Sequence, residues 1–453
     1  MRKLPLKNRD VIAPRGKLEP KVATDARGMA IIHQERKYEL ITPLFGGGVE
    51  PKKNDLAQLI NGKSVRGQLR FWWRACKGVG TTEEMKRNES EVWGAASQPS
   101  QPLTSKVSLS VSVTRHGDPD VPFIMVRNRP RPDDRSSIVT PYAAFSLQPT
   151  DDEMRDALRR GEEVRIESVQ VGVEFSLLIA FPTDVRDQVE SALWCWETFG
   201  GIGGRTRRGF GSIALKSVEE DGRNVSPEKW TTREVLSKIS RRLEGTIATG
   251  EWNPSVPHLP RVTAGVLRVT NAKYHGARRS VSGGRDDVLK SWWYLIDKLH
   301  RFRQSPRNET VYHGRTDWPE PDEIRRRYTA LTGKTTLRAP SHKIRQFPRA
   351  DFGLPIVFKF KDDDRGEPPK TTLEGTNTNR LASPLILRPV LCEDGAVSLA
   401  LILESPRVPD GGVELKGYGA VTTNLAPGDE KEITPLRGKA AKTDVLRAFL
   451  ETL

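Results

Sequence analysis

Arginine residues recur every four positions in one short stretch of the chain. Arg66, Arg70 and Arg74 lie in GKSVRGQLRFWWRACKG, residues 62–78, which also contains Lys63 and has no acidic residue. On a helix, residues four apart share a face, so the three arginines form a stripe beside an apolar one. Guanidinium groups donate paired hydrogen bonds to phosphate, so we expect an exposed face that binds an anion. The alternative is that acids from elsewhere in the chain pair with these arginines.

A second basic stretch, FGGIGGRTRRGFGSI at residues 199–213, contains six glycines between Gly200 and Gly211. A simple turn between a helix and a strand needs only one or two glycines, so this composition indicates a binding loop. Glycines let backbone N–H groups converge on an anion and let another chain approach closely. The residues that we expect to hold phosphate are Gly203, Gly204, Arg205, Arg207, Arg208 and Gly209.

Known nucleotide-binding motifs are incomplete in this chain. AQLINGKS ends like a P-loop, but Ala57 stands where the first glycine is required. Gly201 and Gly203 begin a dinucleotide-binding fingerprint, but Thr206 replaces its third glycine. The basic stretches therefore favour a polyanion over a mononucleotide or dinucleotide.

Catalytic residues are sparse. None of the seven histidines forms a metal-binding helix pair, and we expect no metal and no cofactor. His275 follows Tyr274 and precedes Arg278 and Arg279 in NAKYHGARRS. A histidine or tyrosine beside cations can serve a metal-independent ribonuclease, which is the alternative function. Arg278 and Arg279 are also candidate RNA-binding residues.

Composition points to the kind of partner. The chain has 453 residues and a formal net charge of +15, which favours nucleic acid or an anionic surface. It has no apolar run of about 18 residues and no secretory signal at its N-terminus, so we expect no membrane contact. Three cysteines far apart in sequence indicate buried core residues in a reducing cytoplasm.

The elements that position the basic stretches follow from periodicity. The sequence predicts elements in the order of a split βαβ unit. They are a strand at 37–45, a helix from residue 64, strands at 106–113 and 170–181, a helix at 182–200 and a strand at 211–218. A second unit begins near Arg261 with a strand at 261–272 and a helix at 286–302. Further strands are expected at 354–361, 384–390 and 397–403.

These elements predict an α+β chain with two ferredoxin-like (RRM-like) domains in tandem and basic insertions. Residues 301–350 carry twelve Lys and Arg against five Asp and Glu. The expected organisation is a basic arm at 1–35, a first domain at 36–220, a linker at 221–259, a second domain at 260–435 with an insertion at 304–350, and a C-terminal helix at 436–453.

The motifs together resemble a known family. ELITPLFGGG, SVRGQLRFWWRA and GGIGGRTRRGFGS are similar to motifs of the RAMP superfamily of CRISPR effector proteins. More narrowly, the arginine-bearing helix directly after TPLFGGG resembles the family of first subunits of the type III-B Cmr complex. DFGLPI and SPLILRP look like the second half of that family. The resemblance is closer over residues 37–220 than over 260–410.

This resemblance implies a non-catalytic, cytoplasmic RNA-binding subunit in antiviral defence. It implies contact with guide RNA or target RNA near the 3′ end of the guide, and assembly with other Cmr subunits. Recognition through the RNA backbone and shape would suit a protein that accepts any guide sequence. The alternative that the same superfamily implies is a metal-independent endoribonuclease that processes CRISPR RNA.

Overall fold

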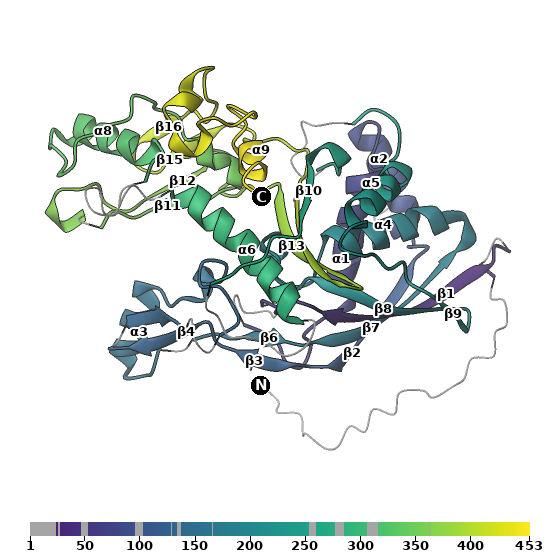
Figure 1. The fold of residues 1–453 in the computed structure, drawn as a ribbon. Helices are drawn as coiled ribbons and strands as arrows, with labels where there is room; N and C mark the ends of the chain where they lie inside the picture. Colours follow the sequence, from purple (N-terminus) through teal and green to yellow (C-terminus); the bar gives the residue numbers. More distant parts are fainter. Residues whose placement is uncertain are drawn as a thin grey trace.

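The computed structural model describes most of the chain (Figure 1). The described residues are 24–25, 28–46, 53–95, 103–127, 129–133, 137–164, 166–252, 260–276, 285–305, 316–361 and 363–453. Most of the expected basic arm, Arg278 and Arg279 lie outside these residues.

The first half of the chain is built on a five-stranded sheet. Its strands run in the order β2-β7-β1-β8-β9, and every neighbouring pair is antiparallel. Helix α1 (Gly62–Lys77) connects β1 to β2, and α4 (Arg186–Phe199) connects β7 to β8. Both helices lie on the same side of the sheet (Figure 1). The strands are β1 (Ile31–Leu40), β2 (Ser108–Arg115), β7 (Glu174–Pro182), β8 (Ile213–Glu220) and β9 (Arg223–Val225).

Alternating and helical periodicities explain how these elements pack. In β1, buried and more exposed residues alternate, so one face of the strand is covered. Strand β1 begins at Ile31, six residues before the expected strand start. The apolar stripes expected on the two helices are buried, which confirms both. They comprise Val65, Leu69, Trp72 and Cys76 on α1, and Val185, Val189, Ala192, Leu193 and Trp196 at or just before α4.

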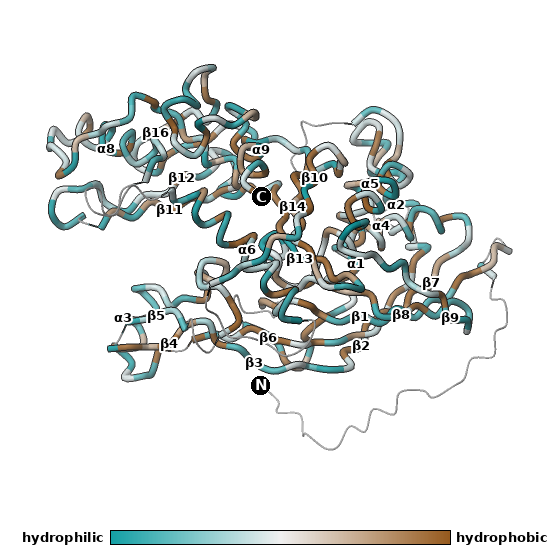
Figure 2. The backbone as a smooth tube through the Cα atoms, viewed as in Figure 1, coloured by the Kyte–Doolittle hydropathy of each residue, from teal (hydrophilic) through white to brown (hydrophobic). Residues whose placement is uncertain are grey.

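The second half contains a three-stranded antiparallel sheet in the order β10-β14-β13. Its strands are β10 (Leu267–Thr270), β13 (Leu385–Cys392) and β14 (Gly395–Ile402). Helix α6 (Arg285–Gln304) packs on β13 and β14, and α5 (Val235–Thr246) lies beside β10. Figure 2 shows that β14 is hydrophobic along most of its length, as expected for a strand buried on both faces.

The expected insertion forms part of a third unit. Helix α8 (Glu320–Thr332) packs with a four-stranded sheet in the order β11-β12-β15-β16. This unit has its own apolar cluster, which includes Ile324, Phe347 and Leu373. The described part of the expected polar insertion therefore contributes to a packed apolar cluster, while the domain boundaries stay a prediction. The strands are β11 (Ile356–Phe358), β12 (Thr371–Gly375), β15 (Val413–Leu415) and β16 (Gly419–Val421).

Smaller elements complete the described part of the chain. Two ribbons pair β3 (Asp118–Asp120) with β6 (Val169–Val171), and β4 (Phe123–Val126) with β5 (Arg129–Pro132). The remaining helices are α2 (Thr82–Trp93), α3 (Asp151–Arg160) and α9 (Val445–Leu450). Cys76, Cys195 and Cys392 are free and buried, as expected. None of the described helices is long and apolar enough to cross a membrane.

Candidate functional site

The arginine stripe of α1 faces the protein. Helix α1 begins after Asn61, whose side chain accepts a hydrogen bond from the Ser64 N–H at 2.8 Å. Arg70 Nε and Arg74 Nη1 lie 2.7 Å and 2.6 Å from the same oxygen, Oε1 of Glu89 on α2. Glu89 is only 5% exposed, so one buried carboxylate serves two arginines. The acid comes from the neighbouring helix, which was the alternative considered from the sequence.

Arg66 is also held by the protein. Its guanidinium donates to Ser105 Oγ at 2.8 Å and to the Val107 carbonyl oxygen at 3.0 Å. Burial, together with the nearby charge of Arg70, lowers the pKa of Arg66. The expected bare, outward-facing stripe is therefore wrong as geometry, although Lys63 in the first turn is exposed. Contact of these four residues with RNA stays a prediction.

The glycines of the second basic stretch allow the protein to pack against itself. Gly203 has a φ of +80°, and a Cβ there would lie 2.6 Å from Leu44 Cδ1. The Gly204 N–H donates to the Phe45 carbonyl oxygen at 2.7 Å. At Gly209, with φ +78°, a Cβ would lie 2.7 Å from the Trp292 ring. The segments that approach these three glycines closely are therefore residues 44–46, which follow β1, helix α6 and strand β13.

The loop arginines extend from the first half to the second. Arg208 Nη1 donates to the Leu385 carbonyl oxygen at 3.1 Å, and Arg207 donates to the carbonyl oxygen of Ser383. Arg205 donates to Ser146 Oγ at 3.2 Å. No described carboxylate lies within ion-pairing distance of these three guanidinium groups. Their positive charge is therefore solvated by dipoles and is not neutralised.

A fourth arginine joins this group from helix α6. Arg303 Nη1 lies 3.5 Å from the Tyr142 hydroxyl oxygen. We call Arg205, Arg207, Arg208 and Arg303 the arginine cluster. Burial foremost, and then the charges of the neighbouring arginines beginning with Arg303, lower the pKa of Arg208 to about 9. Burial likewise lowers the pKa of Arg205 and of Arg207 to about 10. A bound anion would relieve this repulsion, so the cluster favours one.

Aromatic rings surround the cluster. The Arg205 guanidinium lies 5.1 Å from the centroid of Phe145, and the Arg207 guanidinium lies 5.7 Å from that of Phe71 on α1. The Arg303 guanidinium lies 5.3 Å from the centroid of Phe352. Phe145 is 62% exposed, so its ring is accessible to solvent beside the Arg205 guanidinium. Cations beside an exposed ring are typical of sites that bind single-stranded nucleic acid.

The two basic stretches meet at Phe71 and Arg207, but their arginines do not form one surface. Arg70 and Arg74 of α1 face α2, whereas Arg207 and Arg208 of the loop face the second half. Arg303 and Phe145 were missed from sequence because each reaches the cluster only through the tertiary fold. A signal existed for Arg303, which directly follows the helix expected at 286–302 and lies one turn after His300.

Histidine placement bears on the alternative function. His275 is exposed, and Tyr274 beside it packs edge-on against Trp293 with centroids 6.3 Å apart. His300 lies nearer to the arginine cluster, because its ring centroid is 4.4 Å from that of Tyr142. Within the described part of the chain, no group of three His, Cys, Asp or Glu residues could hold a metal ion.

Comparison with known proteins finds a family match in the first half. Residues 37–214 match the family model of the RAMP superfamily. The match includes α1 and the loop arginines, so the resemblance expected from the motifs is confirmed.

A more particular relative is the CRISPR system Cmr subunit Cmr1-2 of Pyrococcus furiosus. The two are 27% identical over 190 residues, which is 40% of this chain and 94% of the relative. The chain also resembles the crystal structure of Cmr1 from Pyrococcus furiosus (apo form), with a TM-score of 0.43, 16% identity, and coverage of 89% of this chain and 96% of that one.

A chain in the cryo-EM structure of the Type III-B Cmr-beta bound to cognate target RNA is similar at a TM-score of 0.44 and 13% identity. That alignment covers 92% of this chain and 99% of the other. At TM-scores below 0.5, these two structural likenesses carry no argument about function.

Proposed function

We propose that this chain is a non-catalytic RNA-binding subunit of a type III-B CRISPR (Cmr) effector. Its partners would be guide RNA, target RNA and other Cmr subunits, in the cytoplasm, with contact near the 3′ end of the guide. The RAMP segment and the 27% identity to a Cmr1-2 subunit support this proposal. The net charge of +15 is consistent with a nucleic-acid partner.

One observation carries the RNA-binding part of the proposal. The arginine cluster holds four guanidinium groups without a carboxylate partner among the described residues, and exposed Phe145 lies beside it. Phosphates would accept hydrogen bonds from the guanidinium groups, and an unpaired base would stack on the ring. Such contacts read the RNA backbone and tolerate any base, as a guide-binding subunit requires.

The finer fold assignment belongs to the same proposal. Strands β2, β7, β1 and β8 with helices α1 and α4 have the order of a split βαβ unit. In the second half, β10, α6, β13 and β14 follow the same order without a fourth strand among the described residues. We infer two ferredoxin-like domains, at about residues 36–220 and 260–435, of which the second is incomplete and carries the α8 unit.

The test combines RNA binding with assembly. The purified chain should bind a labelled single-stranded RNA, with log affinity falling against log salt at a slope of about −0.7 per phosphate contacted. It should also form a complex with purified Cmr subunits and guide RNA in size-exclusion chromatography. Failure to bind RNA at low salt, or failure to join the complex, would contradict the proposal.

A metal-independent endoribonuclease is the second candidate. The stacked pair of His300 and Tyr142 beside Arg303 supplies a potential acid or base next to cations that could bind a scissile phosphate. Incubation of the chain with labelled CRISPR RNA in chelator tests it. Cleavage that His300→Ala abolishes and His275→Ala preserves would favour this candidate, and intact RNA would exclude it.

A further inference from the structure

The two halves differ at one edge of their sheets. In the first sheet, β1 pairs with β7 on one side and with β8 on the other, and both pairings are antiparallel. In the second sheet, β10 precedes helix α6 as β1 precedes α1, and it pairs with β14. On its other side, where β8 would lie by analogy, β10 pairs with no described strand. Alternate backbone groups of an edge strand point away from the sheet and can pair with an added strand.

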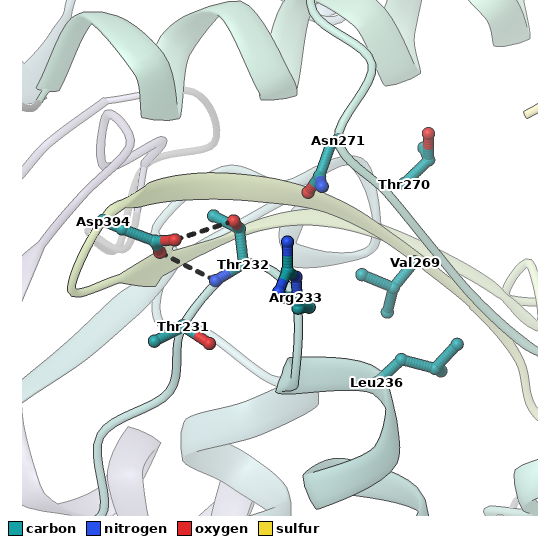
Figure 3. A pocket seen from close by; sticks show the side chains of 8 residues that line it. All are labelled: Thr231, Thr232, Arg233, Leu236, Val269, Thr270, Asn271 and Asp394. Atoms are coloured by element: carbon teal, nitrogen blue, oxygen red, sulfur yellow. Dashed lines mark hydrogen bonds between the residues drawn. The ribbon is translucent and has the colours of Figure 1, made fainter.

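A cavity of about 690 Å³ adjoins this edge. Figure 3 shows its wall, which Val269, Thr270 and Asn271 form at the end of β10. The opposite wall comes from Arg233, in the segment that leads into α5, and from Leu236, in the first turn of that helix. The volume of the cavity falls within the range of ligand-binding pockets, and the cavity lies along a strand edge.

Side chains in the cavity indicate the chemistry of the occupant. The Asp394 carboxylate accepts hydrogen bonds from Thr232 N at 2.7 Å and Thr232 Oγ1 at 2.9 Å (Figure 3). Arg233 is exposed and forms no ion pair with a described carboxylate. Leu236 is 40% exposed and adds an apolar surface. The site therefore offers strand-edge backbone groups, a cation and an aliphatic contact.

We propose that the outer edge of β10 binds an extended segment of a partner protein, which adds an antiparallel strand with an acidic side chain facing Arg233. Main-chain hydrogen bonds to β10 supply the affinity, and Arg233 with Leu236 supplies specificity. The added strand occupies in the second half the position that β8 occupies in the first. The inference rests on the proposed function only in taking the partner to be another subunit of the complex.

Charge disfavours a second copy of this chain as the occupant. Pairing of two β10 edges would bring the exposed Arg268 and Arg233 of one copy toward those of the other. Like charges placed together across an interface are destabilising.

Site-directed cross-linking tests the inference. The three native cysteines are buried, so Asn271→Cys introduces one accessible thiol for a benzophenone label. The labelled chain is assembled with purified Cmr subunits and guide RNA, irradiated, and mapped by mass spectrometry. The same label at Leu158→Cys, a position 81% exposed on α3, controls for random collisions.

The expected product joins residue 271 to an extended, acid-containing segment of another subunit. Arg233→Glu should lower its yield about tenfold, since repulsion replaces attraction, whereas Arg233→Lys should preserve it. A product on this chain, on a second copy or on RNA, or no product in a complex that forms normally, overturns the inference alone. Absence of any complex overturns the proposed function and, with it, the inference.

Discussion

The indole Nε1 of Trp292 donates a hydrogen bond to the carbonyl oxygen of Arg208 at 2.7 Å, which ties helix α6 to the glycine-rich loop. Phe210 packs edge-on against the same indole, with ring centroids 5.0 Å apart. Trp292 is fully buried. The loop backbone is therefore fixed before any ligand binds, which would reduce the entropy lost in the RNA binding that we propose for the arginine cluster.

Arg205→Ala should weaken RNA binding. We expect about a tenfold loss of affinity at moderate salt, and a salt slope smaller by about 0.7, because one phosphate contact is removed. Arg205 is the suitable position because it donates to Ser146 and to none of the carbonyl groups of the second half. The measurement is filter binding across a salt series.

Arg159→Ala is the charge-matched control for that experiment. Arg159 is exposed on α3 and, among the residues that the structure describes, pairs only with Asp156 one turn away, at 3.4 Å. Equal losses in both variants would mean that net charge, and not the arginine cluster, governs binding.

Glu89→Gln should destabilise the fold. The change leaves the Arg70 and Arg74 guanidinium groups without their shared carboxylate. We expect the free energy of unfolding to fall by about 2–3 kcal/mol. The loss is smaller than for a fully buried ion pair because both arginines are partly exposed. Urea denaturation followed by circular dichroism measures it. Glu91→Gln, an exposed position on the same helix, should have little effect. If the two variants unfold alike, the Glu89 contacts are not structural.

Gly209→Ala should loosen the junction between the halves. Gly209 and Gly222 both have a φ of +78°, but only Gly209 has neighbours within 4 Å of an added Cβ. Both variants bear the strain of a left-handed conformation, and Gly209→Ala adds a clash with Trp292 that should cost a further 1–3 kcal/mol or so. The difference between their unfolding free energies isolates the contact. Equal unfolding free energies of the two variants would show that the junction accommodates the added methyl group without loss of stability.

Asp351 should make stability depend on pH. Burial, opposed by Arg407 and aided by Asp444, raises the pKa of Asp351 to about 7 from the ordinary 3.8. Between these values the folded chain keeps a proton that the unfolded chain has lost, so stability falls as pH rises through this window. Asp351→Asn should be about 1–3 kcal/mol more stable than the parent at pH 8 and equal to it near pH 4.

Denaturation at pH 4, 6 and 8 measures the effect of Asp351. Asp363→Asn, an exposed carboxylate nearby in sequence, should follow the parent chain at each pH. A parent stability that does not fall between pH 4 and 7 would contradict the assignment.

Periodicity predicted the elements that bury one face. The stripe from Val185 to Trp196 and the alternation in residues 106–113 each correspond to a structural element, α4 and β2. These patterns are local, so the sequence contains them in full. The antiparallel, mixed α+β organisation followed from the order of the elements.

Charged side chains were harder to place, because their partners are distant in sequence. Glu89 lies on the helix after α1, so the spacing of Arg70 and Arg74 gave no indication of it. In α8, Glu320 and Arg325 are nearly fully buried, although a run of charges normally indicates a solvated face. Glu320 lies 3.1 Å from Arg349, and Arg325 lies 2.7 Å from Glu367. Because these buried charged side chains form ion pairs with one another, the described part of the expected polar insertion belongs to a packed unit.

Arg388 of β13 has a consequence for fragments of this protein. The residue is 2% exposed, and its guanidinium donates to the carbonyl oxygens of Glu197, Gly200 and Ile213 at 2.8, 2.7 and 2.9 Å. A truncation after residue 214 would remove the hydrogen-bond donor of these three carbonyl groups and expose the apolar surface around them. Expression trials that aim for a folded product should therefore keep both halves on one polypeptide.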